Sequence, residues 1–166
     1  MADVFSKAKR SEVMSRIRGR GNRGTELAFV ALMKTYRITG WRRHLAIDLE
    51  PLSGSLVTAE DRGRRRKVRP DFVFPAHRLA IFIDGCFWHG CPKHSGQPAS
   101  NKVFWQRKLS SNKQRDRLVS QALRDQGWIV LRVWEHELRR PRFVYRRLHL
   151  ALEQPRQRAF SRARRH

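Results

Sequence analysis

Apolar positions recur at helical spacing in three stretches of this 166-residue chain. In the first stretch, Thr25 is a candidate N-cap, and Leu27, Val30 and Ala31 follow at spacings that place them on one side of a helix. We therefore predict a helix from Thr25 to about Tyr36.

The other two helical stretches lie in the second half of the chain. Residues 104–126 predict a long and very polar helix, which Gly127 would end at the C′ position. Pro141 is well placed to open a final helix. The apolar stripes of these two helices consist of Leu118, Val119, Ala122 and Leu123 in one, and Val144, Leu148, Ala151 and Leu152 in the other.

Three apolar runs predict strands. Residues 71–74 and 79–83 are short runs separated by a turn at residues 75–78, and residues 128–134 form a third, mostly apolar run that predicts a central strand. The predicted order is helix, strand, strand, helix, strand, helix. This order is typical of a small α/β domain with a mixed sheet flanked by helices.

The remaining segments are rich in arginine and glycine. We expect a basic N-terminal arm over residues 1–24, one folded domain over 25–153 and a basic, disordered tail over 154–166. Glycine and proline interrupt the chain repeatedly between residues 37 and 69. We read a basic insertion at about 42–69 as a hairpin or a long loop with an exposed basic tip.

The charge balance indicates a polyanionic partner. Lysine and arginine number 37 against 14 acidic residues, which gives a formal net charge of +23. A nucleic acid fits this excess best. A membrane is a weaker reading because no stretch is long and apolar enough to span one. We see no secretory signal in the polar residues 1–10, and two cysteines are too few for a disulfide scaffold, so we expect a reducing cytoplasm.

Cysteine and histidine cluster after the second predicted strand. Cys86, Cys91 and His94 have the spacing C-x₄-C-x₂-H. His136 follows the third strand, and if the two strands pair in parallel it would reach the same edge of the sheet. A Cys₂His₂ set suits a tetrahedral structural zinc ion. The alternatives are two buried free cysteines with surface histidines, or His89 in one of the ligand positions.

Carboxylates are scarce, so the positions of three of them are informative. Asp71 opens one strand, Asp84 ends the next, and Glu26 stands on the first helix. Oxygen ligands of this kind hold Mg²⁺ against a phosphate, although a lone Pro-Asp pair is also a common strand start. Many nucleases with this strand layout carry a lysine two residues after the second acid. Cys86 stands there instead, which leaves His89 as the candidate general base.

Aromatic side chains occupy an unusual place in the polar loop. Phe87 and Trp88 lie between a cysteine and a histidine, and Trp105 stands at the start of the long helix. Such rings either insert between base pairs or form a small hydrophobic core under the loop. Asn112 and the Arg115–Arg117 segment follow on the helix and could contact phosphates or base edges.

Together these motifs resemble the Vsr (very-short-patch repair) nucleases. The resemblance runs from about residue 7 to about residue 150, and its most specific part is the run Gly85-Cys86-Phe87-Trp88-His89. The other matching residues are Lys7, Arg10, Ser11, Met14, Thr25-Glu26, Pro70-Asp71-Phe72-Val73, Ile81-Phe82-Ile83-Asp84, Gly90-Cys91-Pro92, Phe104-Trp105, Lys108, Asn112, Arg115-Asp116, Gly127-Trp128 and Val133-Trp134-Glu135.

The resemblance implies a restriction-endonuclease-like, three-layer fold with a structural zinc site. It also implies an endonuclease that nicks one DNA strand 5′ of the thymine in a T·G mismatch, which arises when 5-methylcytosine deaminates. Asp71 and the main-chain carbonyl of Ile83 would bind Mg²⁺, His89 would activate water, and Glu26 would support it. Some members carry histidine where Asp84 stands, so Asp84 would bind the metal directly or through water.

The resemblance also assigns the zinc and DNA contacts. The zinc ligands would be Cys86, Cys91, His136 and, near the remaining position, His94. The DNA contacts would come from Phe87, Trp88, Trp105, Met14, Asn112 and Arg115. The implied partners are double-stranded DNA with a T·G mismatch, mismatch-repair proteins and a companion cytosine-5 methyltransferase. We expect a monomer, bound to no membrane, associated with the nucleoid in the bacterial cytoplasm.

Two other functions remain open at this point. A restriction-type nuclease of the same fold would cut matched duplex DNA. A non-catalytic, zinc-containing DNA-binding module would not need Asp71, Asp84 and His89 beside one another.

Overall fold

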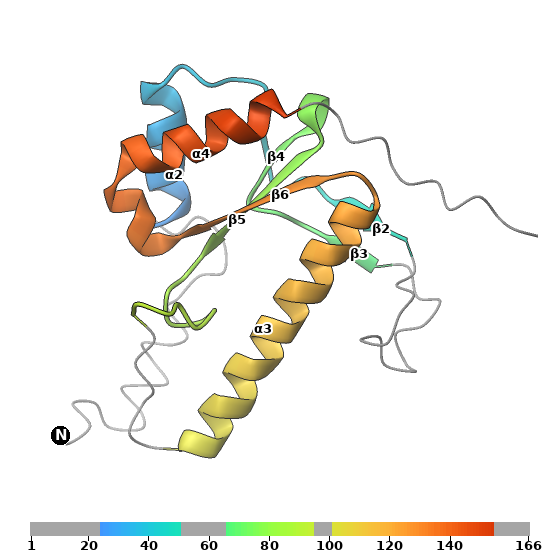
Figure 1. Cartoon of the computed structure of the whole chain (residues 1–166), viewed down its shortest axis with the longest axis vertical. Helices are drawn as coiled ribbons and strands as arrows, with labels where there is room; N and C mark the ends of the chain where they lie inside the picture. Colours follow the sequence, from blue (N-terminus) through green and yellow to red (C-terminus); the bar gives the residue numbers. More distant parts are fainter. Residues whose placement is uncertain (1–23, 51–65, 95–100, 155–166) are drawn as a thin grey trace, which may run out of the picture.

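The computed structural model describes residues 24–50, 66–94 and 101–154 (Figure 1). The predicted basic arm, with Met14, lies outside these residues except for Gly24. The tip of the predicted insertion and the predicted tail beyond Gln154 also lie outside them. No helix in the described part is long and apolar enough to cross a membrane.

A four-stranded mixed sheet forms the centre of the domain. Its order is β1-β4-β5-β6, with antiparallel pairing between β1 and β4 and between β4 and β5, and parallel pairing between β5 and β6. The strands are β1 (Arg42–Arg43), β4 (Phe72–Phe74), β5 (Leu79–Asp84) and β6 (Ile129–Trp134). The predicted mixed sheet is therefore confirmed, and β1 is an additional edge strand. The prediction that residues 128–134 form a central strand is wrong: β6 lies at the other edge of the described sheet, and its residues are apolar because helices pack on both of its faces.

Helices cover both faces of this sheet (Figure 1). The helices are α2 (Glu26–Thr35), α3 (Lys102–Asp125) and α4 (Pro141–Glu153), with short 3₁₀ segments η2 (Pro75–His77) and η3 (Glu135–Arg139). The larger core packs Phe29 of α2 and Leu148 of α4 against Phe72 and Ile81 of the sheet. The smaller core packs α3 on the opposite face. This gives the predicted arrangement of a central sheet between helices.

The long helix α3 ends as its sequence predicts. Gly127 adopts a positive φ of 77°, its amide donates to the carbonyl of Arg124, and the Trp128 amide donates to the carbonyl of Leu123. These two hydrogen bonds form a Schellman motif. The start differs from prediction because α3 begins at Lys102. Thr25 precedes α2 as expected but makes no capping bond through its side chain.

The region predicted as a basic insertion contributes a two-stranded antiparallel ribbon. β2 (Ile47–Leu49) pairs with β3 (Arg66–Val68). Ile47 and Leu49 are buried in the smaller core beside Leu123 of α3. The hairpin reading is confirmed for these strands, whereas the predicted basic tip lies outside the described residues.

Candidate functional site

The parallel pairing of β5 and β6 brings two functional segments to one edge of the sheet. Asp84 is the register partner of Trp134, so both strands end side by side. The loop after β5 carries Cys86 and His89, and the segment after β6 carries His136. The sequence prediction that these segments meet depended on parallel strands, and the structure has them.

Four sulfur and nitrogen ligand atoms converge at this edge. Cys86 Sγ lies 3.2 Å and Cys91 Sγ 3.6 Å from His136 Nδ1, and Cys91 Sγ lies 3.7 Å from His94 Nδ1. All four ligand atoms lie within 4.8 Å of one another. A tetrahedral zinc ion with bonds of about 2.0–2.3 Å separates its ligands by about 3.3–3.8 Å. The donor set and its spacing therefore fit zinc.

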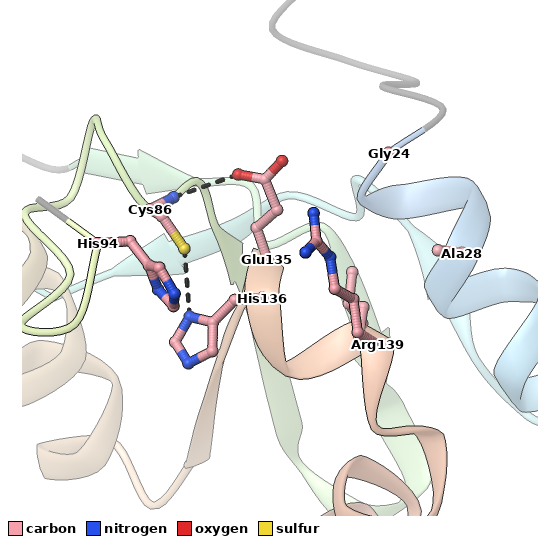
Figure 2. Close-up of a pocket in the computed structure, with 8 residues that line it drawn as sticks. Gly24, Ala28, Cys86, His94, Glu135, His136 and Arg139 are labelled. Carbon is pink, nitrogen blue, oxygen red and sulfur yellow. Dashed lines mark hydrogen bonds between the residues drawn. The ribbon is translucent and has the colours of Figure 1, made fainter.

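The surroundings of the two thiols favour a bound cation. Glu135 accepts a hydrogen bond from the Cys86 amide at 3.3 Å, and His94 and His136 face the same sulfur atom (Figure 2). Burial raises the pKa of the Cys86 thiol, and the neighbouring Cys91 raises it further. A zinc ion would hold the Cys86 sulfur as a thiolate, which the protein surroundings alone disfavour.

A second cluster joins α2 to the start of β4. Ligand atoms of Glu26, His44 and Asp71 lie within 4.8 Å of one another. Glu26 is buried and accepts a hydrogen bond from Arg43, and its Oε2 lies 3.1 Å from His44 Nε2. Asp71 Oδ2 accepts the Ile83 amide at 2.7 Å. Two carboxylates in one place suit a divalent cation that prefers oxygen.

The electrostatics of Asp71 also fit a cation site. Burial raises the pKa of Asp71 from 3.8 to about 6, the hydrogen bond from Ile83 lowers it, and the charges of Glu26 and Asp84 raise it. A carboxylate held in such surroundings gains from a positive charge placed beside it.

His89 lies in a third cluster, between two carboxylates. Its Nδ1 is 2.6 Å from Asp116 Oδ2 and 3.5 Å from Asp84 Oδ1. Burial raises the pKa of Asp116, but the bonds and charges of His89 and Arg132 outweigh it and leave that pKa lowered. The short contact fixes the imidazole and leaves Nε2 available to a substrate.

Arg132 neutralises the carboxylate that ends β5. Its Nε and Nη2 donate to the two oxygens of Asp84 at 2.7 and 2.6 Å, and Nη2 lies 3.2 Å from Asp116 Oδ1. Asp84 is only 3% exposed. Both of its oxygens are thus bound to a guanidinium, although Asp84 is also predicted as a catalytic, metal-binding residue.

Residues of the second and third clusters line one cleft. Its floor includes Asp71, Ile83, Asp84, His89, Asp116 and Arg132. Most of the residues expected at the catalytic centre are therefore gathered in one cleft.

The aromatic residues form a compact group beside the loop. Ring centroids of Phe87 and Trp105 lie 5.2 Å apart, and those of Trp88 and Trp105 5.9 Å apart. Trp105 is buried, whereas Phe87 and Trp88 are half-buried. Phe104 adds a half-exposed ring 5.3 Å from Trp105.

The predicted DNA contacts on α3 have different environments. Asn112 is buried and donates its amide to the Trp88 carbonyl at 2.9 Å. The side chain of Arg115 is 62% exposed and lines the cleft. Met14 lies outside the described residues.

Three residues of the site, His44, Asp116 and Arg132, are not among the site residues predicted from the sequence. Two of them leave a signal there. Arg132 is a lone charge within an apolar strand, and Asp116 follows Asn112 by four residues, which places both on one face of a helix. His44 leaves no pattern of this kind.

Comparison with known proteins identifies related DNA endonucleases. The family model "DNA mismatch endonuclease Vsr" matches residues 61–95, which include Asp71 and the loop with His89. Among the relatives is the "Type II nicking enzyme V.NaeI" of Lentzea aerocolonigenes, 59% identical over 71 residues, or 43% of each chain. The chain spans only about half the length of the first three relatives.

Longer matches cover nearly the whole chain. The "DNA mismatch endonuclease Vsr" of Escherichia coli is 35% identical over 84% of this chain and 77% of its own length. The "Type II nicking enzyme V.NmeAIP" of Neisseria meningitidis is 30% identical over 89% of this chain and 92% of its own length. On these two alignments, the chain belongs to the Vsr family of DNA mismatch endonucleases.

Proposed function

We propose that this protein is an Mg²⁺-dependent endonuclease that nicks one strand of duplex DNA 5′ of the thymine in a T·G mismatch. The observation that carries the proposal is the short pair between His89 and Asp116, in a cleft that also holds the half-buried carboxylate Asp71. The names of the relatives, a mismatch endonuclease and nicking enzymes, support the reaction class.

His89 is the proposed general base. Asp116 accepts a hydrogen bond from the Nδ1–H group of His89. The Nε2 lone pair is then free to take a proton from an attacking water molecule. As the water oxygen bonds to phosphorus, the bond from phosphorus to a sugar oxygen breaks. This arrangement of a base oriented by a carboxylate is typical of hydrolytic sites.

Asp71 and the Ile83 carbonyl are the proposed Mg²⁺ ligands, with Glu26 in support. The Ile83 amide donates to Asp71, and the amide and carbonyl of one strand residue point to the same side, so that carbonyl faces Asp71 as well. When bound, Mg²⁺ neutralises the negative charge that develops on the phosphate.

We propose that Asp84 is a positioning residue. Both of its oxygens are bound to Arg132, which also reaches Asp116 and so ties the partner of His89 to the end of β5. This role requires no direct bond from Asp84 to the metal.

Zinc bound by Cys86, Cys91, His94 and His136 is proposed to be structural. The loop that bears His89 runs between the two cysteines, so the ion would fix the position of the base. Zinc would also fix Phe87 and Trp88, which we propose form with Trp105 the wedge that enters the base stack. The bond from Asn112 to the Trp88 carbonyl supports the wedge from α3.

The remaining expectations belong to the same proposal. The protein would act as a monomer on DNA in the bacterial cytoplasm, together with mismatch-repair proteins and a companion cytosine-5 methyltransferase. Met14 would also contact the DNA.

A nicking assay tests the proposed function. End-labelled duplexes that differ only in one pair, T·G, T·A or C·G, are incubated with Mg²⁺ in several flanking contexts. We expect a single nick 5′ of the mismatched thymine. Cutting of matched duplexes on both strands would support a restriction-type nuclease instead, and tight binding without any cutting would support a non-catalytic module.

A further inference from the structure

The β2–β3 ribbon forms a basic wall of the active-site cleft. Arg66, Lys67 and Arg69 line the same cleft as Asp71 and His89. None of these three basic residues is required by the proposed chemistry. The question is therefore what this charged wall binds.

The pairing register determines which ribbon side chains face the cleft. Arg66 is the partner of Leu49, and Val68 is the partner of Ile47. Partners in an antiparallel pair lie on the same face, and Ile47 and Leu49 are buried against the domain. Arg66 therefore projects from the inner face of the ribbon, at the end of the apolar contact, where the cleft begins.

Arg69 is held close to the catalytic carboxylate. It follows β3 and precedes Pro70 and Asp71, so only one residue separates the two charges along the chain. Arg69 is exposed and has no ion-pair partner among the described residues. Its charge is available to a polyanion that enters the cleft.

The ribbon is attached firmly enough to hold a ligand in register. Its inner residues share the smaller core with Ala122 and Leu123, and Gln126 Nε2 donates to the Asp48 carbonyl at 3.3 Å. Lys67 contributes less because it lies 3.5 Å from Asp48, and both side chains are well exposed.

Helix α3 adds another basic residue to the lining of the cleft. Arg115 of α3 lines it and is 62% exposed. The distance along the extended chain from Arg66 to Arg69 is about 10 Å, or about three nucleotide steps of duplex DNA. The ribbon and α3 can therefore both present cations to a phosphate backbone in the cleft.

We propose that Arg66 and Arg69 bind phosphates of the duplex on the ribbon side of the cleft, next to the phosphate contact that Arg115 of α3 can make. The proposal rests on the proposed function, since it assumes that DNA enters this cleft. The ribbon would add affinity and orientation without reading bases, because phosphate contacts carry no sequence information of their own.

The test measures how binding depends on salt. Fluorescence anisotropy gives the Kd of a labelled T·G duplex and of its matched T·A counterpart, without Mg²⁺, over a series of KCl concentrations. Each lost phosphate contact lowers the slope of log K against log salt by about 0.9. For Arg66→Gln combined with Arg69→Gln we expect a slope smaller by about 2 and an equal loss of affinity for both duplexes.

A matched control separates the ribbon from general charge. Arg146 is exposed on α4, which covers the other face of the sheet, so Arg146→Gln removes one charge far from the cleft. We expect it to keep the wild-type slope, and we expect Arg69→Lys, which retains the charge, to restore most of the slope lost in Arg69→Gln. Circular dichroism verifies that each variant is folded.

Two results would overturn the proposal: a wild-type slope in the double variant, or an equal drop in slope for Arg146→Gln. The proposed function is tested by a different result: it would be wrong if the wild-type protein nicked no duplex. A reduced slope in the ribbon variants would then still support the ribbon as a DNA contact.

Discussion

The Nδ1 atom of His89 lies 2.6 Å from Oδ2 of Asp116, across the gap between a loop and the middle of helix α3. No other acidic residue lies in α3 before Asp125. The pair joins the proposed base to the long helix α3, and its function can be tested directly.

Asp116→Asn should slow nicking by a factor of about 10² to 10⁴, because the amide can no longer hold the imidazole in the tautomer that leaves Nε2 unprotonated. Single-turnover nicking of a T·G duplex at saturating protein measures the rate, and anisotropy measures binding. Asp125→Asn, at the end of the same helix, is the control and should keep the wild-type rate. An unchanged rate in Asp116→Asn would remove this pair from the mechanism.

Asp71→Asn should abolish nicking, leave duplex binding largely intact, and stabilise the protein in the absence of Mg²⁺. The pKa of Asp71 is raised by burial to about 6 in the folded state, above its ordinary 3.8. The folded state therefore holds this proton more tightly, and the contribution of Asp71 to stability falls as pH rises from about 4 to about 6. At pH 7.5 the substitution should relieve at most about 3 kcal/mol.

Thermal melts of wild type and Asp71→Asn at pH 4 and pH 7.5, without added Mg²⁺, measure this effect. The gain in Tm should be present at pH 7.5 and much smaller at pH 4, where the folded state holds the proton and the unfolded state, with its ordinary pKa of 3.8, is partly protonated. A variant less stable than wild type at pH 7.5 would contradict the interpretation that the ionised form of Asp71 is unfavourable in the folded protein when no cation is bound.

Loss of the proposed zinc site should destabilise the loop from Cys86 to His94 and lower the nicking activity. His94→Ala should lower the zinc content below one ion per chain and lower the Tm, because the loop from Cys86 to His94 has little core of its own. His149→Ala is a matched control, since His149 is an exposed histidine that pairs with Glu153 on α4. Full metal content in His94→Ala, measured by atomic emission, would exclude that residue as a ligand.

Arg132→Leu should be strongly destabilising. The substitution leaves Asp84 buried without its bidentate partner, which in other proteins costs about 3–5 kcal/mol. The double variant with Asp84→Leu should recover much of this loss, and a double-mutant cycle in urea gives the coupling energy. Additive losses would show that the two side chains act independently.

Much of this fold follows from local sequence patterns. The end of α3 depends on Gly127, whose positive φ is easy for glycine, and the apolar runs of β5 and β6 predict strands without knowledge of their partners. The central position predicted for β6 is wrong, because its apolar run reflects helices on both faces and not strands on both sides. By contrast, β1 consists of two exposed arginines, and only its pairing with β4 makes it a strand.

The residues of the candidate site can be predicted from the sequence where they lie together in one segment. The loop with Cys86 and His89 contains much of its own signal. His44 could not be assigned because its place beside Asp71 depends on β1 pairing with β4, where its own amide also bonds to the Asp71 carbonyl. Arg132 is matched to Asp84 only through the alignment of two strands distant in sequence.

The α3 helix has a consequence for fidelity. Asn112 holds the backbone of Trp88, and one turn further along, Asp116 holds His89. Both residues belong to one continuous helix of 24 residues, which is about 36 Å long. If Trp88 enters the base stack, any shift of its backbone is therefore transmitted within one turn to the partner of the base. Recognition of the base pair and hydrolysis of the DNA backbone would then both depend on α3. A duplex into which Trp88 inserts poorly would therefore also be cut slowly.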